Sequence, residues 1–269
     1  KKLQVISQVT DRDRSQMQQL LSDCPITIHP SESEEIFEIL VEAYTKETCV
    51  RVRIIRFHTN IVLVEKNGQI LEEATPETES SSEEVDLLTV KDILDFADTA
   101  DLNDVKEILN RQIRYNTAIK EEGLTGKWGA AIGATLLENY GQDVSVRARA
   151  AAAAGSDARM GGCELPVIIN SGSGNQGMTA SLPVIEYAKE LNATSEQLYR
   201  ALLVSNLLTI HLKTGIGRLS AYCGAVSAGC AAGAAIAYLH GGGYKEVSHT
   251  LVNSLAIVSG IVCDGAKPS

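Results

Sequence analysis

The sequence has no excess of positive charge, because its 269 residues include 24 Lys and Arg against 34 Asp and Glu. A net charge of −10 argues against a broad phosphate-binding face, and we expect no nucleic-acid partner. Cysteine is also sparse, with six residues scattered along the chain. This spacing lacks the density of a secreted disulfide scaffold, so a reducing cytoplasm is the expected compartment.

Long apolar runs are missing as well. The stretch 221–239 is nearly free of charge, yet it consists mostly of Ala and Gly, and such weak hydrophobicity favours a buried helix over a membrane span. No secretory signal opens the chain, and its start at Lys1 rather than Met suggests a fragment. We therefore expect no membrane association. The length favours two domains.

The first 75 residues combine a helical pattern with alternating ones. Residues 10–21 predict a helix that begins at a Thr or Asp cap. Apolar and polar residues alternate over 36–42 and 50–54, and a further apolar run at 61–64 ends at the turn Lys66-Asn67-Gly68. These patterns predict a small helix-plus-antiparallel-sheet domain over residues 1–75. Residues 76–87, which are rich in Ser and acidic side chains, predict an acidic linker or loop.

From residue 88 onward the apolar spacing becomes helical. Five apolar residues lie on one face of a segment that stops at Gly123: Leu102, Val105, Ile108, Leu109 and Ile113. Further helices are expected to end near Gly141, to follow Asp143, to run from the capping box at 194–197 to about Lys213, and to span 217–240 and 246–262. Residues 88–269 therefore predict an all-helical catalytic domain, and the whole chain an α+β protein. Its many small residues favour close helix packing.

A Gly- and Ser-rich segment interrupts this helical half between two apolar runs. It reads Ser171-Gly172-Ser173-Gly174-Asn175-Gln176-Gly177, and a helix is expected to resume after it. Glycines allow close approach to backbone N–H groups, and the following helix N-terminus favours an anion such as a substrate carboxylate. A flexible linker is the plainer alternative. The segment lacks the Lys and Ser/Thr of a P-loop, and no strand-to-helix dinucleotide-binding unit is evident.

Two cysteines stand at turn-like points of the helical half. Cys223 lies in AYCGAVSAGC, and Cys263 begins the terminal CDGAKPS. Two such thiols suggest a metal or cluster site, although a free cysteine is more often a small buried hydrophobe. We assign the remaining four to the core: Cys24, Cys49, Cys163 and Cys230.

Four separated segments, in order and spacing, carry a family resemblance. They are HTNIVLVEKNG, DARMGGCELPVIINSGSGNQGMTASLPV, AYCGAVSAGC and CDGAKPS. Together they resemble the cysteine desulfidase and serine dehydratase-like family, including its UPF0597-type bacterial members, over nearly the whole chain. The resemblance implies a bacterial lyase of amino-acid catabolism with a serine dehydratase-like fold. It also implies a 4Fe-4S cluster on three cysteines and a small L-amino acid as substrate.

The resemblance places Cys223 and Cys263 at two of the three cluster ligands. The family pattern has its third ligand directly after Ser269, and a further motif, Gly-Cys-Thr-Glu-Pro, ahead of the position of Lys1. With two ligands, we expect this chain to hold a cluster poorly, and we expect both thiols to face the SGSGNQG segment. The substrate carboxylate would lie at residues 171–176, oriented by Asn175 and Gln176. Lys267 would add charge near the site, with a solvated lysine as the alternative.

The expected reaction is α,β-elimination from L-cysteine to sulfide, pyruvate and ammonia. Elimination of water from L-serine is the alternative within the same mechanism, since no motif encodes the leaving-group pocket. Two other classes stay open. A non-catalytic amino-acid-binding protein would bind ligand without Cys223 and Cys263, and an assembly module of Ala/Gly-rich helices that forms homo-oligomers would bind no small molecule.

Overall fold

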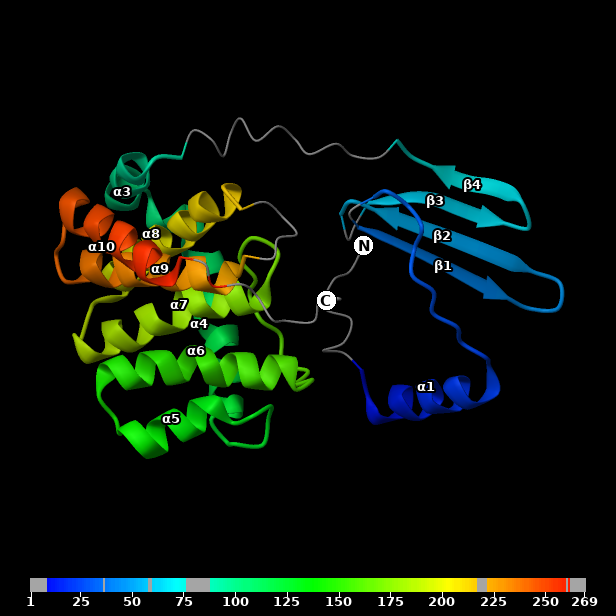
Figure 1. Ribbon diagram of the computed structural model, residues 1–269, viewed down its shortest axis with the longest axis horizontal. Coiled ribbons are helices and arrows are strands. Elements are labelled where there is room, and N and C mark those ends of the chain that lie inside the picture. The colour runs from blue at the N-terminus through cyan, green and yellow to red at the C-terminus, as the bar shows by residue number, and fades with distance from the viewer. Residues whose placement is uncertain are drawn as a thin grey trace. The chain divides into compact units, whose positions relative to one another are not determined.

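The computed structural model describes residues 9–35, 37–57, 60–75, 88–216, 222–259 and 261. The chain divides into two compact units, residues 1–82 and 83–269 (Figure 1). The first contains a helix and an antiparallel sheet, and the described part of the second is helical apart from its loops. The predicted α+β class is therefore confirmed.

The helix of the first unit, α1 (Asp11–Asp23), begins at Thr10 as the sequence predicts. The Thr10 side chain accepts a hydrogen bond from Asp13 N, and the Asp13 carboxylate accepts one from Thr10 N at 2.9 Å. No residue of α1 is buried. Cys24, which follows the helix, is exposed, so its predicted place in the core is wrong. The reason is that α1 contributes no side chain to a core.

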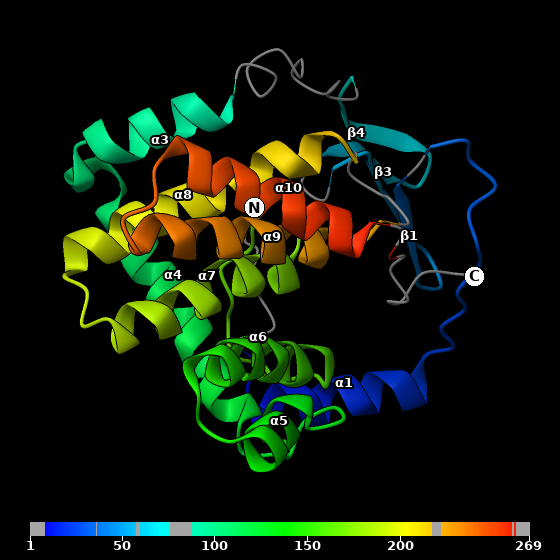
Figure 2. The ribbon, with the colours of Figure 1, turned by 60° about the vertical axis from the view of Figure 1, so that its left-hand side comes forward.

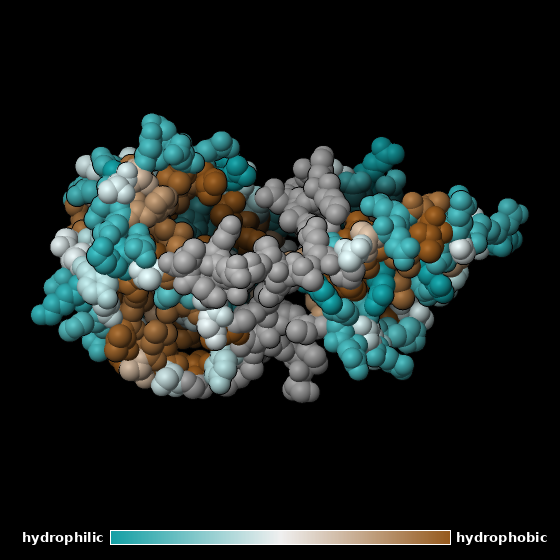
Figure 3. All heavy atoms as spheres, turned by 90° about the horizontal axis from the view of Figure 1, so that it is seen from above, coloured by the Kyte–Doolittle hydropathy of each residue, from teal (hydrophilic) through white to brown (hydrophobic). Residues whose placement is uncertain are grey.

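The sheet has the order β1-β2-β3-β4, and every neighbouring pair is antiparallel. Its strands are β1 (Glu38–Tyr44), β2 (Cys49–Ile55), β3 (Ile61–Lys66) and β4 (Gln69–Glu73). Asn67 and Gly68 both have positive φ, 51° and 80°, which suits the tight turn between β3 and β4. The sequence pattern does not predict β4, because apolar and polar residues do not alternate in this short strand. Figure 3 shows that hydrophilic and hydrophobic residues both lie on the surface of the protein.

The helical unit is built from α3 (Val90–Thr99), α4 (Leu102–Gly123), α5 (Ile132–Tyr140), α6 (Val144–Met160), α7 (Gly174–Glu190), α8 (Ser195–Thr214), α9 (Gly224–Leu239) and α10 (Tyr244–Val258). Helix α7 lies between α6 and α9 (Figures 1 and 2). The capping box at Thr194 and the end of α4 at Gly123 are confirmed. Two expected boundaries are wrong, because α9 starts only after Cys223 and α10 spans 244–258 rather than 246–262.

Small residues let the helices pack closely, as the sequence predicts. A Cβ atom at position 123 would lie 1.9 Å from Ala154 O, and one at position 133 would lie 2.5 Å from Ala154 Cβ. Glycine is therefore required where α4 and α5 meet α6. The hydrophobic core extends through α7, α8 and α9, and includes Met178, Leu202 and Cys230. Within the described residues, no helix is both long and apolar enough to cross a membrane.

Candidate functional site

The predicted Gly/Ser segment begins with a tight turn. Asn170 and Ser173 exchange backbone hydrogen bonds of 3.1 Å in both directions. The two residues between them have positive φ, 48° at Ser171 and 84° at Gly172. Such a pair of angles defines a type I′ turn, in which Gly is favoured. The turn holds Gly172 at the surface and directs the chain into α7.

Helix α7 starts inside the segment that the sequence predicts as a loop. Ser173 is its N-cap, and the Ser173 side chain accepts a hydrogen bond from Gln176 N. Residues 174–177 therefore form the first helical turn, which corrects the expected extent of the loop. The N–H groups of Gly174 and Asn175 come at the start of the helix, where no intrahelical acceptor exists. This turn has no acidic side chain, so its partial positive charge is not neutralised from within the helix.

The first turn of α7 is packed too tightly for side chains at two positions. A Cβ atom on Gly177 would lie 2.0 Å from Ile168 O, and one on Gly174 would lie 2.4 Å from Arg159 Nε. The chain before the turn consequently runs against the helix that follows it. These glycines serve close approach of the backbone and the Arg159 side chain.

The side chain of Asn116, in α4, holds the chain before the turn and the start of α7 together. Its amide group donates to Gly177 O at 3.2 Å and to Ser181 Oγ at 3.0 Å, and its Oδ1 accepts from Ile168 N at 2.9 Å. The side chain is fully buried. One residue thus joins the strand-like approach to the turn and the first turns of α7. A buried amide with all these partners satisfied orders its surroundings.

A second chain of amides supports the turn itself. Gln112 of α4 and Asn206 of α8 exchange side-chain hydrogen bonds of 2.9 and 2.8 Å. The Asn170 amide donates to Asn206 Oδ1 at 3.0 Å, and the Ser171 hydroxyl donates to Asn170 Oδ1 at 2.8 Å. Ser171 therefore points toward this support.

Arg159, near the C-terminal end of α6, reaches the start of α7. Its Nη1 donates to Asn175 Oδ1 at 3.2 Å, and the guanidinium group lies against Gly174. The side chain is half-buried, and no carboxylate of the described residues lies within ion-pair distance of it. Asn175 is thus engaged with a cation.

The start of α9 meets the same turn. A Cβ atom on Gly224 would lie 2.5 Å from Gln176 Cδ, so the two groups are in direct contact. Cys223 is the N-cap residue of α9; it is a half-buried free cysteine with no side-chain capping hydrogen bond. The Gln176 side chain is buried, and its Oε1 has no hydrogen-bond partner among the described groups. The N-termini of α7 and α9 therefore converge around an unsatisfied acceptor.

The predicted cluster ligands can be placed only in part. Cys223 precedes Gly224, which contacts Gln176 of the SGSGNQG segment, whereas Cys263 and Lys267 lie outside the described residues. Among the side chains that the structure describes, no group of three or more His, Cys, Asp or Glu could hold a metal. The thiol of Cys223 is a suitable ligand for an iron-sulfur group, whose remaining ligands would come from residues outside the described ones.

The sequence reasoning missed five residues that shape this site: Gln112, Asn116, Arg159, Asn170 and Asn206. One signal was present, because Gln112, Asn116 and Lys120 recur at a spacing of four on the same face of the helix as its apolar residues. No comparable signal marked Asn206. Its role depends on how α8 crosses α4.

The third residue in that row, Lys120, forms a buried ion pair with Glu186 near the other end of α7. Lys120 Nζ lies 3.2 Å from Glu186 Oε1, and the two side chains are 6% and 9% exposed. Burial raises the pKa of Glu186, but Lys120 and Lys189 outweigh it and hold that pKa below its usual value. The cavity beside this pair, of about 120 Å³, is lined also by Arg147. The cluster of charges is internally compensated and is therefore structural.

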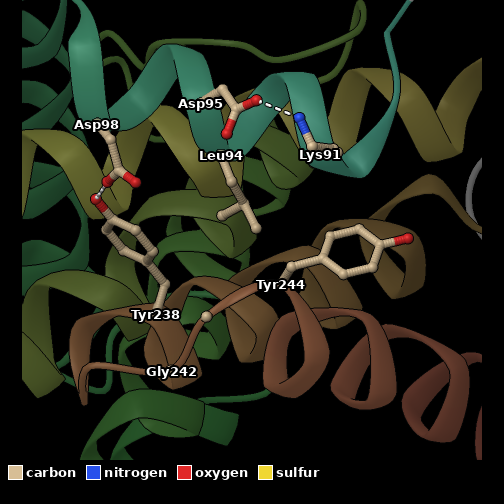
Figure 4. A pocket seen from close by; sticks show the side chains of 8 residues that line it. Lys91, Leu94, Asp95, Asp98, Tyr238, Gly242 and Tyr244 are labelled. Carbon is tan, nitrogen blue, oxygen red and sulfur yellow. Dashed lines mark hydrogen bonds and ion pairs between the residues drawn. The ribbon is translucent and has the colours of Figure 1, made fainter.

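A larger cavity, of about 300 Å³, lies at the opposite end of α9 (Figure 4). Its polar groups are paired with one another. Tyr238 donates to Asp98 at 2.5 Å, and Lys91 pairs with Asp95 at 2.8 Å. Tyr244 points away from these two pairs in Figure 4. This cavity therefore shows no buried group in need of a ligand, unlike the turn at Gln176.

Comparison with known proteins identifies the family of this chain. The family model for the serine dehydratase alpha chain matches residues 1–269. A UPF0597 protein of Desulfitobacterium hafniense is 57% identical over 99% of this chain and 63% of its own length. Corresponding proteins of Lachnoclostridium phytofermentans and Fusobacterium nucleatum are 50% and 45% identical, each over all of this chain and 65% of their own length.

The chain thus spans slightly less than two thirds of the relatives that it matches. No solved structure matches it. The match of the family model over every residue, together with the UPF0597 relatives, shows that this chain belongs to the serine dehydratase alpha chain family.

Proposed function

We propose that the whole protein is an iron-sulfur-dependent lyase that eliminates sulfide from L-cysteine, with L-serine as the alternative substrate. The observation that carries the proposal is the convergence of the α7 and α9 N-termini at Gln176, where Gly224, the residue after Cys223, makes the contact. The family membership supports an amino-acid substrate. Because the chain spans less than two thirds of its relatives, residues outside it would complete the site.

The start of α7 offers a binding place for the carboxylate of an amino acid. Free N–H groups and the helix dipole both favour a negative group there. Gln176 presents a buried oxygen without a donor, and the ammonium group of an amino acid is a donor of matching chemistry. The two ends of one small zwitterion would therefore be held by neighbouring groups of a single helical turn.

The reaction breaks the Cα–H and Cβ–S bonds and forms a Cα–Cβ double bond. The proton leaves to a base, the electron pair of the Cα–H bond becomes the new π bond, and the sulfur leaves with its own electron pair. The aminoacrylate product takes up water to give pyruvate and ammonia. The fixed position of the turn, supported by Asn116 and Asn170, would keep the reacting carbon atoms in one orientation.

Cys223 and Cys263 are the residues of this chain that would hold the cluster, with a third ligand after Ser269. An iron atom with an open coordination position would supply a Lewis acid. The contribution of this chain would be to place Cys223 at the edge of the amino-acid site and to keep that edge packed. Gly224 permits the packing, since it brings the start of α9 against Gln176.

The test is anaerobic reconstitution of the full-length protein with iron and sulfide, followed by assays of sulfide and pyruvate from L-cysteine. We expect cluster absorbance and both products. Cys223→Ala should lose both signals, whereas Cys24→Ala, at an exposed cysteine, should retain them. Reconstituted wild-type protein without cluster absorbance, or without either product, would contradict the proposal.

L-Serine is favoured as a second candidate by the match to the serine dehydratase alpha chain model. Elimination of water from L-serine yields pyruvate and ammonia without sulfide. Comparison of kcat/KM for the two amino acids on the same preparation separates them. Higher kcat/KM for L-cysteine supports the first candidate, and higher kcat/KM for L-serine supports the second.

A further inference from the structure

The charge of Arg159 lies beside the N-terminal end of helix α7 and has no carboxylate partner among the described residues. Its guanidinium group lies against Gly174 at the start of the 17-residue helix α7, where the helix dipole is positive. Arg159 belongs to the last turn of α6, whose dipole favours a cation there but supplies no full negative charge. Arg159 is nevertheless half-buried, and it has no carboxylate partner in the described part of the chain. The Arg159 guanidinium and the N-terminal end of α7 are both positive, and no acidic side chain among the described residues lies between them. This combination indicates a binding site for an anion.

A second, independent observation indicates a ligand at the same turn. Gln176 is only 5% exposed, and its Oε1 lacks a donor within the described residues. A buried polar oxygen without a partner costs free energy and is uncommon in native proteins. Gln176 belongs to the first turn of α7, and the Arg159 guanidinium lies against Gly174 in the same turn. A ligand that carries both an anion and a hydrogen-bond donor would satisfy them together.

We infer that Arg159 binds the carboxylate of the amino-acid substrate and that Asn175 holds Arg159 in position for it. The inference rests on the proposed function and adds a residue that determines substrate class. The planar guanidinium can make two parallel hydrogen bonds to a carboxylate, and one of its Nη1 hydrogen bonds already goes to Asn175 Oδ1 at 3.2 Å. Asn175 is thus a positioning residue, because it fixes the side chain that contacts the substrate.

Asn175 also explains why this cation stays unpaired. An amide oxygen accepts a hydrogen bond from Arg159 without neutralising its charge. Aspartate at the same position would form an internal ion pair, and a substrate carboxylate would then have to compete with it. Asn175→Asp is therefore a variant that differs by one functional group and removes the charge offered to the substrate. It also keeps the contact that supports the fold.

The experiment measures equilibrium binding to the full-length protein by calorimetry. The probes are L-serine and ethanolamine, which keeps the amine and hydroxyl groups but lacks the carboxylate. Arg159→Gln should weaken L-serine binding about 10- to 100-fold, as expected for loss of a charge-assisted pair, and leave ethanolamine binding unchanged. Arg159→Lys should restore part of the affinity because it restores the charge.

The matched control is Arg149→Gln, at an exposed arginine on the same helix, which should bind L-serine like the wild type. Asn175→Asp should also weaken L-serine binding at least tenfold, with no loss of thermal stability. If Arg159→Gln does not fold, L-serine binding by Asn175→Asp is the test of the proposal. In the activity assay, we expect Arg159→Lys to raise KM more than it lowers kcat.

The assignment is overturned if folded Arg159→Gln or Asn175→Asp binds L-serine as the wild type does. It is equally overturned if Arg159→Gln loses L-serine and ethanolamine to the same extent, or if the wild type binds no amino acid. If the wild type shows the predicted pattern of binding and yet eliminates neither sulfide nor water, the lyase proposal fails and the role of Arg159 stands.

Discussion

Gly224 at the start of α9 lies directly against the side chain of Gln176 in the first turn of α7. A Cβ atom at position 224 would stand 2.5 Å from both Gln176 Cδ and Nε2. No side chain larger than hydrogen fits there while Gln176 stays in place. The contact joins the residue after Cys223 to the predicted amino-acid site.

Gly224→Ala should therefore displace Gln176 or push α9 outward. We expect a loss of about 1–3 kcal/mol in the free energy of unfolding, as for other overpacked sites, and weaker amino-acid binding. Denaturant titration and calorimetry measure the two effects. Gly229→Ala on the same helix is the control, since its Cβ would meet only Thr179 Cγ2 at 3.8 Å. Equal behaviour of the two variants would contradict this prediction.

Asn116→Ala should destabilise the helical unit by about 2–4 kcal/mol, because it opens a cavity and leaves Ile168 N without its acceptor. The approach to the turn should lose protection against amide hydrogen exchange, since Asn116 also joins Gly177 O and Ser181 Oγ. Asn103→Ala, at an exposed position on α4, is the control. Unchanged exchange at residues 167–170 in folded Asn116→Ala would refute the role given to this amide.

Glu186→Gln should lower the free energy of unfolding by about 1–3 kcal/mol, as expected for loss of a hydrogen-bonded charge facing the buried Lys120. The change is limited because Lys120 also contacts Glu121 at 2.6 Å. Glu107→Gln removes a carboxylate whose side chain is 88% exposed, and it should have no measurable effect. Urea titrations of both variants test the difference. If Glu186→Gln leaves the free energy of unfolding unchanged, the ion pair adds nothing to stability.

The same carboxylate predicts a dependence of stability on pH. The pKa of Glu186 is raised by burial but is held below its usual value by the stronger combined attraction of Lys120 and Lys189. A lowered pKa in the folded state means that its contribution is present above the unfolded value, about 4.3, and is lost as the pH falls further. Wild-type stability should fall more steeply than that of Glu186→Gln between about pH 5 and pH 3. If the free energies of unfolding of the two proteins fall in parallel with pH, Glu186 does not have a lowered pKa in the folded state.

Tyr238→Phe should weaken the contact between α9 and α3 by about 1–2 kcal/mol, because Asp98 loses the phenol hydrogen bond. Burial, and then the Asp98 carboxylate, raises the pKa of Tyr238 well above its usual value. Its stabilisation is consequently lost only in strongly alkaline solution. In an ultraviolet titration, the last of the eight tyrosines to ionise should disappear in Tyr238→Phe. Tyr244→Phe, at an exposed tyrosine of the same cavity, should leave that step unchanged.

Local signals in the sequence were sufficient for most helices and three strands. Thr10 and Thr194 cap their helices with backbone hydrogen bonds formed within three residues, so the sequence alone predicts them. The start of α7 was misplaced because Gly174 and Gly177 usually indicate a loop. They are helical here because Ser173 caps α7, and they are glycines because Ile168 O and Arg159 Nε lie where a Cβ atom would be. Cys24 was misassigned because residue type carries no information on whether α1 covers a core.

The sequence by itself determined the α+β class, the family, the Gly/Ser segment and Cys223 as the residues of interest, since motifs and periodicity are local properties. Only the tertiary structure decided which distant residues surround that segment. Arg159, Asn116 and Asn206 come from three different helices, and side-chain packing between helices, rather than spacing along the chain, brings them to one turn. The physical reason is that hydrogen bonds and charges act over a few ångströms in space, whatever the separation in sequence.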